Sequence, residues 1–213
     1  MLILVFIITM ALCAVLAVGQ NSRVYESEQL DRVGYGDVTS WIIEQPGVEE
    51  LIDQIEELRG TEKTERQKIK QVLYKAGKKQ TQNNGMLAVY EPENYDYYIY
   101  KEDLTGIQKN PKEPKDGEMY VSPSFITMYG VDIGDSVEIQ IAGEEKQMRF
   151  TIRGFFEDPF AGSSMMGVKT MLINKASMEE LEQNALMAGD ASTVADAEML
   201  HIFQKKDRRQ KNL

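Results

Sequence analysis

The chain has 213 residues, of which 42% are hydrophobic and 27% are charged, as is typical of a folded globular protein. Its single cysteine and single histidine exclude a disulfide framework and a zinc site built from paired cysteines or histidines. The formal net charge of −10 argues against a nucleic-acid-binding surface, which needs clustered lysine and arginine.

The N-terminal segment is apolar. From Met1 to Val18 the only polar side chain is that of Thr9. Such a run extends about 27 Å as a helix, close to the thickness of about 30 Å of the hydrocarbon core of a membrane. We therefore expect a transmembrane helix over residues 1–20. A cleaved signal peptide is the alternative, because Ala17-Val18-Gly19 fits a small-residue cleavage pattern, although no cation precedes the apolar run.

The rest of the chain divides into an acidic body and a short basic tail, Lys205–Leu213. Cytoplasmic flanks of membrane helices favour lysine and arginine, whereas long domains are translocated whatever their charge. The predicted localisation is therefore the cell membrane, with a single N-terminal span and the acidic body on the extracytoplasmic side.

In the first part of the body, residues Val33–Ile43 predict a strand, which Pro46 and Gly47 close. The next segment is typical of an amphipathic helix that ends at Gly60, with acidic residues on one face. The residues expected on its apolar face are Leu51, Ile52, Ile55 and Leu58.

The following segment has a less definite pattern. Residues from Ile69 to Tyr90 favour a β-hairpin around Ala76-Gly77-Lys78. A helix over Thr61–Lys75 is the alternative, because this stretch is highly charged and its period is hard to assign.

The second half has clearer signals. Met119–Val121 predicts a short strand, and Ser122-Pro123 predicts the N-cap and first position of a helix that ends at Gly130. Alternating residues then predict a hairpin with one buried face, formed by residues 137–141 and 148–152 around a turn at Gly143.

The C-terminal part contains one further predicted helix. Ser177 and Glu180 have the spacing of a capping box, and Leu181 lies in the helix that they open. Small and acidic residues from Gly189 to Ala197 predict a loop or linker, which leads to the basic tail.

Four runs together resemble a known family. They are GEMYVSPSF (117–125), YGVDIGDSV (129–137), FTIRGFFEDPF (150–160) and GSSMMGVK (162–169). They resemble the extracytoplasmic domain of FtsX-like (MacB-type) ABC transporter permeases. The last run is the most specific and is similar to the version found in Gram-positive permeases.

This resemblance implies an α+β fold: a mixed α/β extracytoplasmic domain with an inserted, mostly-β lobe, preceded by one transmembrane helix. The implied divisions are the transmembrane helix (1–20), the α/β lobe (21–115), the mostly-β lobe (116–175), and a helix that returns to the α/β lobe with the basic tail (176–213).

The resemblance also implies a function without catalysis. Such a domain has no catalytic, cofactor or metal site, and it couples the conformational change driven by a separate cytoplasmic ABC ATPase to export or to another extracytoplasmic process. The implied partners are a second permease subunit, identical or different, that ATPase and membrane lipid. Because no later apolar segment is long enough for the family's three further spans, we expect a fragment, a truncated product or a split subunit.

Three sets of polar residues are weak candidates for a metal site or for catalysis. Asp132 and Asp135 are typical of a turn that introduces a strand rather than of a metal site. Ser163 lacks a nucleophile's GxSxG context, and Glu157-Asp158 before a proline indicates the end of a strand. We therefore expect no enzyme activity.

Two clusters are candidate binding sites. The first is a partner-contact loop in which two methionines offer adaptable apolar contact, and its residues are Gly162, Ser163, Ser164, Met165, Met166 and Gly167. The second is a ligand surface rich in tyrosine, and its residues are Tyr90, Tyr95, Tyr97, Tyr98 and Tyr100. The second cluster supports the alternative function, a secreted or anchored module that binds a peptide or glycan; a tyrosine-rich segment packed on its own sheet is the other interpretation.

Overall fold

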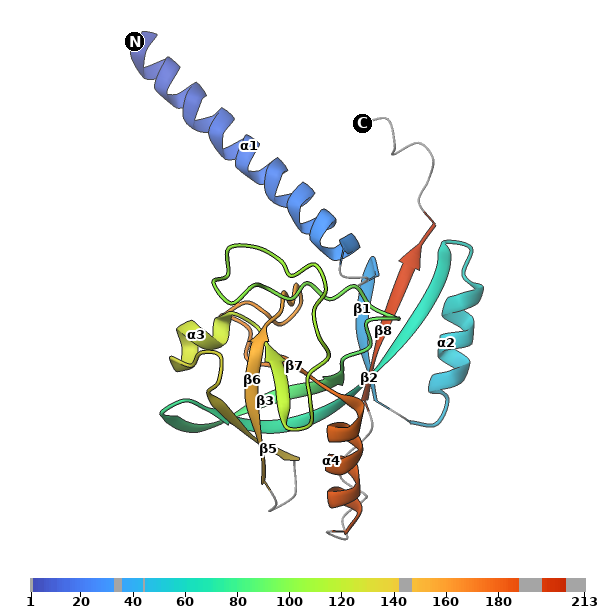
Figure 1. Cartoon of the computed structure of the whole chain (residues 1–213). Helices are drawn as coiled ribbons and strands as arrows, with labels where there is room; N and C mark the ends of the chain where they lie inside the picture. The colour runs from blue at the N-terminus through green and yellow to red at the C-terminus, as the bar shows by residue number, and fades with distance from the viewer. Residues whose placement is uncertain (1, 33–35, 44, 142–146, 188–196, 206–213) are drawn as a thin grey trace.

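The computed structural model describes residues 2–32, 36–43, 45–141, 147–187 and 197–205. Figure 1 shows a long N-terminal helix and a body in which helices flank one curved sheet. The elements are α1 (Leu2–Arg32), β1 (Val38–Ile43), α2 (Val48–Glu57), β2 (Thr61–Ala76), β3 (Lys79–Val89), β4 (Glu118–Val121), α3 (Ser124–Tyr129), β5 (Ser136–Ile141), β6 (Gln147–Phe155), β7 (Lys169–Ile173), α4 (Lys175–Met187) and β8 (Ala197–Gln204).

The described strands form a single mixed sheet in the order β1-β8-β2-β3-β7-β4-β6-β5. The pairs β3–β7 and β4–β6 are parallel, and the remaining pairs are antiparallel. The 16-residue strand β2 pairs with β8 over its first part and with β5 over its second part. The β2–β5 pairing closes six strands into a ring, and β8 and β1 extend the sheet beyond that ring.

The main hydrophobic core fills this ring. The predicted hairpin is confirmed as β5 and β6, with Val137 opposite Phe150. Val137, Ile139 and Phe150 are buried, whereas Arg149 and Thr151 are exposed, because successive side chains of a strand point to opposite faces. The predicted turn at Gly143 lies outside the described residues.

The α2 helix covers the part of the sheet outside the ring. It follows Gly47, whose positive φ of 90° suits glycine, and it packs Val48 and Ile52 against Leu200 of β8. The apolar spacing predicts Leu51 and Leu58 on this buried face, but both are exposed. The buried stripe is narrower than the sequence indicates, and these two leucines lie beside it.

The predicted hairpin between Ile69 and Tyr90 is confirmed as β2 and β3, and the alternative helix over Thr61–Lys75 is wrong. The predicted strand at residues 33–43 is confirmed as β1, which starts at Val38; residues 33–35 lie outside the description. The predicted strand at residues 119–121 is confirmed as β4.

Both predicted helix caps differ from the structure. Pro123, not Ser122, occupies the N-cap of α3, and the Ser122 hydroxyl bonds that of Ser124. The helix α4 starts before Ser177, whose backbone N–H donates to Asn174 Oδ1 and whose own hydroxyl accepts from the Gly117 N–H. Asn174 thus performs the capping that the spacing assigns to Ser177.

Two strands, β7 and β8, have no counterpart among the predicted elements. The first predicted residue of the basic tail, Lys205, follows β8 directly, and Ala197, assigned to the linker, begins this strand. Residues 189–196 of the predicted linker and residues 206–213 of the tail lie outside the described residues. The sheet joins strands from both sides of the predicted boundary at residues 115 and 116, and the division into two lobes stays a prediction.

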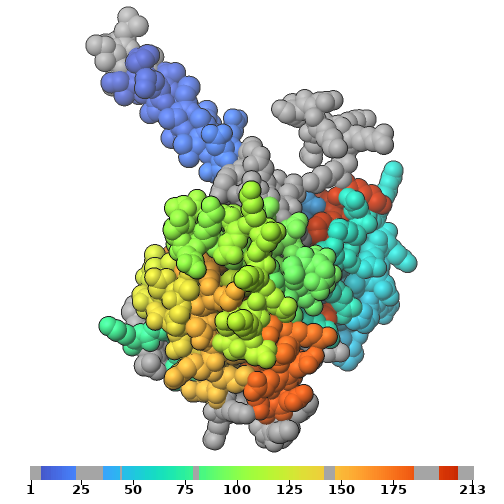
Figure 2. Space-filling view, in the orientation of Figure 1, coloured from blue at the N-terminus to red at the C-terminus, as the bar shows by residue number. Residues whose placement is uncertain are grey.

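The helix α1 extends away from the body (Figure 1; Figure 2). Its described apolar side chains from Phe6 to Val18 are exposed. Within the part of the chain that the structure describes, no helix is both long and apolar enough to cross a membrane. The predicted span over residues 1–20 is therefore not confirmed.

Candidate functional site

The three runs that open the family resemblance meet in space. The strand β4 from the first run lies parallel to β6 from the third run. The Thr151 N–H donates to the Gly117 carbonyl over 2.8 Å, and the Ile152 N–H donates to the Asp135 carbonyl over 2.8 Å. Segments separated by up to some thirty residues thus form one hydrogen-bonded unit.

The aspartates of the second run stabilise a turn, as their spacing predicts. Asp135 Oδ2 accepts the Asp132 N–H over 2.8 Å, and Asp132 Oδ1 accepts the Ile133 N–H over 2.7 Å. Gly134 completes the turn with a φ of 92°. Within the described ranges, no group of three or more His, Cys, Asp or Glu residues is arranged to hold a metal ion.

The predicted partner-contact loop follows these runs and is held from beneath by two buried charged side chains. Asp158 Oδ1 accepts the N–H groups of Phe160 and Ala161, each over 2.9 Å. Lys169, which is fully buried at the start of β7, donates from Nζ to the carbonyls of Ala161 and Ser163. Burial raises the pKa of Asp158 and lowers that of Lys169.

The loop itself has a tight base and an exposed tip. A side chain at Gly162 would place its Cβ 2.2 Å from the Asp158 carbonyl oxygen, so only glycine fits there. The Ser163 hydroxyl accepts the Met165 N–H over 3.2 Å. Met165 is 93% exposed, whereas Met166 is only partly exposed. Of the two methionines predicted to offer a contact, Met165 is therefore the one fully available.

The five tyrosines predicted as a ligand surface pack largely against the protein itself. Tyr90 and Tyr95 are buried, contrary to a surface role, and Tyr97, Tyr98 and Tyr100 are partly exposed. The ring centroids of Tyr90 and Tyr97 are 4.8 Å apart, and those of Tyr95 and Tyr97 are 6.0 Å apart. This packing stabilises the connection between β3 and β4, which Figure 2 shows in green across this face of the body.

The hydroxyl groups of these tyrosines also bond to the sheet. Tyr95 donates to the Arg66 carbonyl over 3.1 Å, and Tyr97 donates to the Val89 carbonyl over 3.2 Å. Burial raises the pKa of Tyr90 and of Tyr95 to about 12, so both stay neutral at ordinary pH. Ligand binding by the remaining partly exposed rings stays a prediction.

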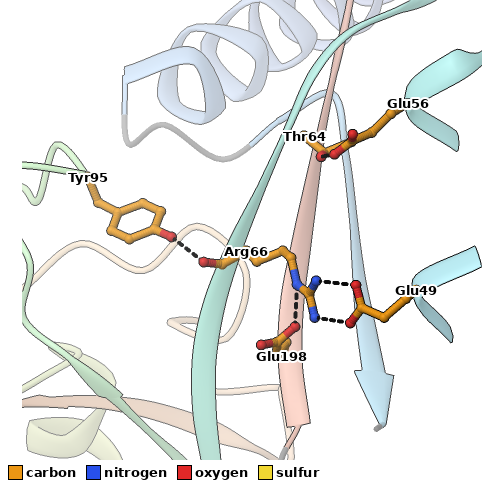
Figure 3. A network of polar contacts seen from close by, with 6 residues as sticks. All are labelled: Glu49, Glu56, Thr64, Arg66, Tyr95 and Glu198. Carbon is orange, nitrogen blue, oxygen red and sulfur yellow. Dashed lines mark hydrogen bonds and ion pairs between the residues drawn. The ribbon is translucent and has the colours of Figure 1, made fainter. Parts of the chain in front are cut away.

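A polar network that the sequence does not reveal lies on the opposite face of the sheet (Figure 3). The guanidinium of Arg66 on β2 binds both carboxylate oxygens of Glu49 on α2 over 2.8 Å and Glu198 on β8 over 2.6 Å. Bidentate arginine–carboxylate pairs are strong and directional, so this network fixes α2 on the sheet. Thr64 and Glu56 add a second contact between the same two elements.

A pocket of about 550 Å³ lies beside this network, between α2 and α4. Its lining combines cations and carboxylates, among them Arg66, Lys68, Lys70, Glu182 and Glu198. Lys70 lies 3.5 Å from Glu182, so part of this charge is neutralised within the protein. The alternating cations at positions 66, 68 and 70 are the sequence signal that places them on one face of β2.

No family model matches the chain, and no curated protein matches it in sequence. Its structure is similar to the extracellular domain of the noncanonic ABC-type transporter YknZ from Gram-positive bacteria, with 11% identity, a TM-score of 0.36, and coverage of 76% of this chain and 75% of that one. It is also similar to the periplasmic region of MacB from Actinobacillus actinomycetemcomitans, with 8% identity, a TM-score of 0.38, and coverage of 84% and 80%.

A third similar structure is a permease domain from Porphyromonas gingivalis, with 17% identity and a TM-score of 0.35. The similarity covers 82% of this chain but 64% of that domain, so the chain spans less than two thirds of its length.

Proposed function

We propose that this chain is the extracytoplasmic domain of an FtsX-like ABC transporter permease, anchored to the cell membrane by residues 1–20. It acts without catalysis: it transmits a conformational change driven by a cytoplasmic ABC ATPase, through contact with a second permease subunit. The observation that carries the proposal is the convergence of the family-like runs 117–125, 129–137 and 150–160 into one hydrogen-bonded unit.

The three runs are short, but in the folded chain they are joined by backbone hydrogen bonds. Each run supplies backbone partners to another, through Gly117, Asp135 and Ile152. Segments that support one another in this way form one folded unit, so the three runs are consistent with a single structural motif.

The loop that follows supports a contact with a partner. Buried Asp158 and Lys169 bind its backbone, while Met165 at its tip has almost no contact with the rest of the body. An anchored base with a flexible, exposed apolar tip suits a contact that changes during a transport cycle.

The exposed apolar side chains of α1 support a membrane anchor. Phe6, Leu12 and Val18 point into solvent in the isolated chain, and burial of such side chains in lipid is strongly favourable. The alternative of a module that binds a peptide or glycan is less favoured, because two of its five tyrosines are buried.

Photo-cross-linking in the cells that produce the chain tests the proposal. Met165 in the full chain is replaced by p-benzoylphenylalanine, and cross-linked products are identified by mass spectrometry. The matched control carries the same group at Gln183, which is exposed on α4. We expect Met165 to give an adduct with an ABC transporter permease subunit, including a second copy of this chain, and Gln183 to give none.

Two outcomes would contradict the proposal. Adducts with an extracellular peptide or glycan, but with no permease subunit, would favour the binding module. Equal permease adducts from Met165 and Gln183 would mean that the loop has no specific contact.

A further inference from the structure

The exposed hydrophobic side chains of the body gather at one margin of the sheet. Outside α1, five of the seven large exposed hydrophobic residues in the described part of the chain lie on β1, on α2 or at the C-cap of α2. We call this set the β1 margin; its residues are Val38, Trp41 and Ile43 on β1, exposed by 44–51%, Leu51 on α2, exposed by 55%, and Leu58 at the C-cap of α2, exposed by 60%.

Among the described residues, one side of the β1 backbone pairs with no other strand. β1 is the last strand in the sheet order, and within the described residues its only strand partner is β8. Its six residues, VTSWII, include no charge and no proline. Natural edge strands are normally protected by lysine, proline or a covering element, so an edge without these features is suited to receiving another strand.

The two leucines of α2 lie above this open side. Glu49 and Glu56 of α2 reach toward β2, where they contact Arg66 and Thr64. Leu51 comes two residues after Glu49, and Leu58 comes two residues after Glu56. Two residues correspond to about 200° of rotation around a helix. Leu51 and Leu58 therefore face away from β2, toward β1, since β8 separates β1 from β2 in the sheet.

The charges near the β1 margin distinguish between possible binding partners. On the solvent side of α2, the carboxylates of Glu50, Asp53 and Glu57 have no hydrogen-bond or ion-pair partner among the described residues. The helix contains no cation, and Arg59 follows Leu58 directly after the helix ends. A second copy of the chain would oppose one acidic helix to another, and an anionic membrane surface would also be repelled. A segment with both apolar and basic side chains complements this margin in both shape and charge.

We propose that the β1 margin binds an extended peptide segment of a partner protein, with apolar and basic side chains, as an added strand along β1. Backbone hydrogen bonds to β1 supply affinity. Successive side chains of the added strand point to opposite faces of the sheet, so one set contacts Trp41, which packs against Phe160, and the other set contacts Leu51 and Leu58 on the face that α2 covers. This site is separate from the Met165 tip, and it does not depend on the proposed permease function.

Trp41 is the only tryptophan of the chain, so its fluorescence reports directly on this margin. The experiment titrates the full chain in detergent micelles with an eight-residue lysine–valine peptide, in which two lysines at each end flank four valines, so that apolar side chains reach both faces of the sheet. We expect saturable binding that reduces acrylamide quenching of Trp41 roughly twofold, because the added strand covers the indole ring.

Two comparison peptides test separately the contributions of charge and of backbone hydrogen bonds to binding. The same peptide with glutamate in place of lysine is expected to bind at least about tenfold more weakly, because the acidic helix repels it. A lysine–valine peptide with N-methyl groups on alternate residues, which cannot form the strand hydrogen bonds, is expected to give no protection of Trp41.

The double variant Leu51→Lys/Leu58→Lys is expected to weaken binding of the lysine–valine peptide at least about tenfold. The control Leu104→Lys makes the same change at an exposed leucine outside the margin and is expected to bind normally. Denaturation curves of each variant check that these exposed substitutions leave the fold intact.

Equal binding of the N-methylated peptide, or unchanged binding by the double variant, would overturn the proposal. Protection of Trp41 by phosphatidylcholine vesicles but not by the peptide would instead assign the margin to the membrane. Protection that depends on protein concentration alone would assign it to a second copy of the chain.

Discussion

His201 is the only histidine of the chain, and it is buried in β8. Its Nδ1 lies 3.0 Å from the Thr39 hydroxyl, and the ring of Tyr95 packs against it. Burial lowers its pKa from 6.5 to about 4, although nearby Glu65 acts in the opposite direction. The imidazole is therefore neutral in the folded protein at physiological pH.

We expect this residue to make folding sensitive to mild acid. Between pH 6.5 and 4 the unfolded chain binds the proton and the folded chain does not, so the free energy of unfolding falls as the pH is lowered through this range. The loss attributable to His201 is about 3 kcal/mol. Urea denaturation at several pH values measures it, with His201→Asn as the comparison.

NMR gives an independent check, because a single histidine yields one Cε1–H resonance to titrate. A measured pKa near 6.5 would contradict the buried, neutral imidazole. A His201→Asn protein that loses as much stability as the unsubstituted chain between pH 6.5 and 4 would assign the acid sensitivity to the carboxylates.

Single residues also show what the sequence reveals about the candidate site. The exposure of Met165 could be anticipated, because glycine and serine flank the Met165-Met166 pair on both sides. The burial of Tyr90 and Tyr95 could not, because it depends on contacts with β2 and β8 from distant parts of the chain. Tyrosine has an apolar face and a polar tip, so composition alone does not distinguish a binding surface from packing.

At the scale of elements, the β5–β6 hairpin gives the sharpest test of register. Phe150 is fully buried in the main core, and the adjacent Thr151 points outward. We expect Phe150→Ala to lower the free energy of unfolding by about 3 to 5 kcal/mol, because it leaves a cavity. Thr151→Ala should change it by no more than about 0.5 kcal/mol. Guanidinium denaturation of the full chain measures both; equal losses would mean that the strand register is wrong.

The elements that the sequence predicts well are those with one buried and one solvated face. In β5 and β6, apolar and polar residues alternate, so the period is visible. All five residues of β7 are buried, so its sequence lacks the alternation of apolar and polar residues. Its first residue, Lys169, is charged and therefore does not indicate a buried strand. The strand lies between β3 and β4, and both of its faces are covered: Met171 and Ile173 belong to the main core and Leu172 to a second hydrophobic cluster. None of these contacts is local in the sequence.

The strand β8 illustrates a different difficulty. Glu198 and His201 interrupt its apolar residues, so the segment does not resemble a buried strand. Glu198 is accommodated because Arg66 binds its carboxylate, and His201 because its imidazole is neutral. Partners from β2 and β1 thus make the strand possible, and the sequence does not disclose them.

At the scale of the molecule, long-range pairing gives the body its organisation. The β2 strand joins β8 and β1 to the ring because it is long enough to pair with β8 and then with β5. The family resemblance implies the mixed α/β class, and the structure has it. The closure of the ring could not be predicted, since it links residues 72–76 to residues 137–141 without a local signal.

The arrangement of α1 and the body leads to a prediction about topology. The helix carries apolar side chains on every described face from Phe6 to Val18, whereas the body carries the acidic charge. An apolar helix is stabilised in lipid, and a long acidic domain is tolerated outside the cell. We therefore expect α1 to be embedded in the membrane and the body to lie on the extracytoplasmic side.

Cysteine labelling measures this topology, because Cys13 in α1 is the only cysteine of the chain. In intact cells, or in spheroplasts where an outer membrane is present, a membrane-impermeant maleimide should leave Cys13 unlabelled until the membrane is dissolved. The variant Cys13→Ser/Gln183→Cys should be labelled without lysis, because position 183 is exposed on α4. Labelling of this variant only after lysis would place the body inside the cell. Labelling of Cys13 in intact cells would show that α1 is not embedded, since a thiol within the hydrocarbon core is inaccessible to a charged reagent.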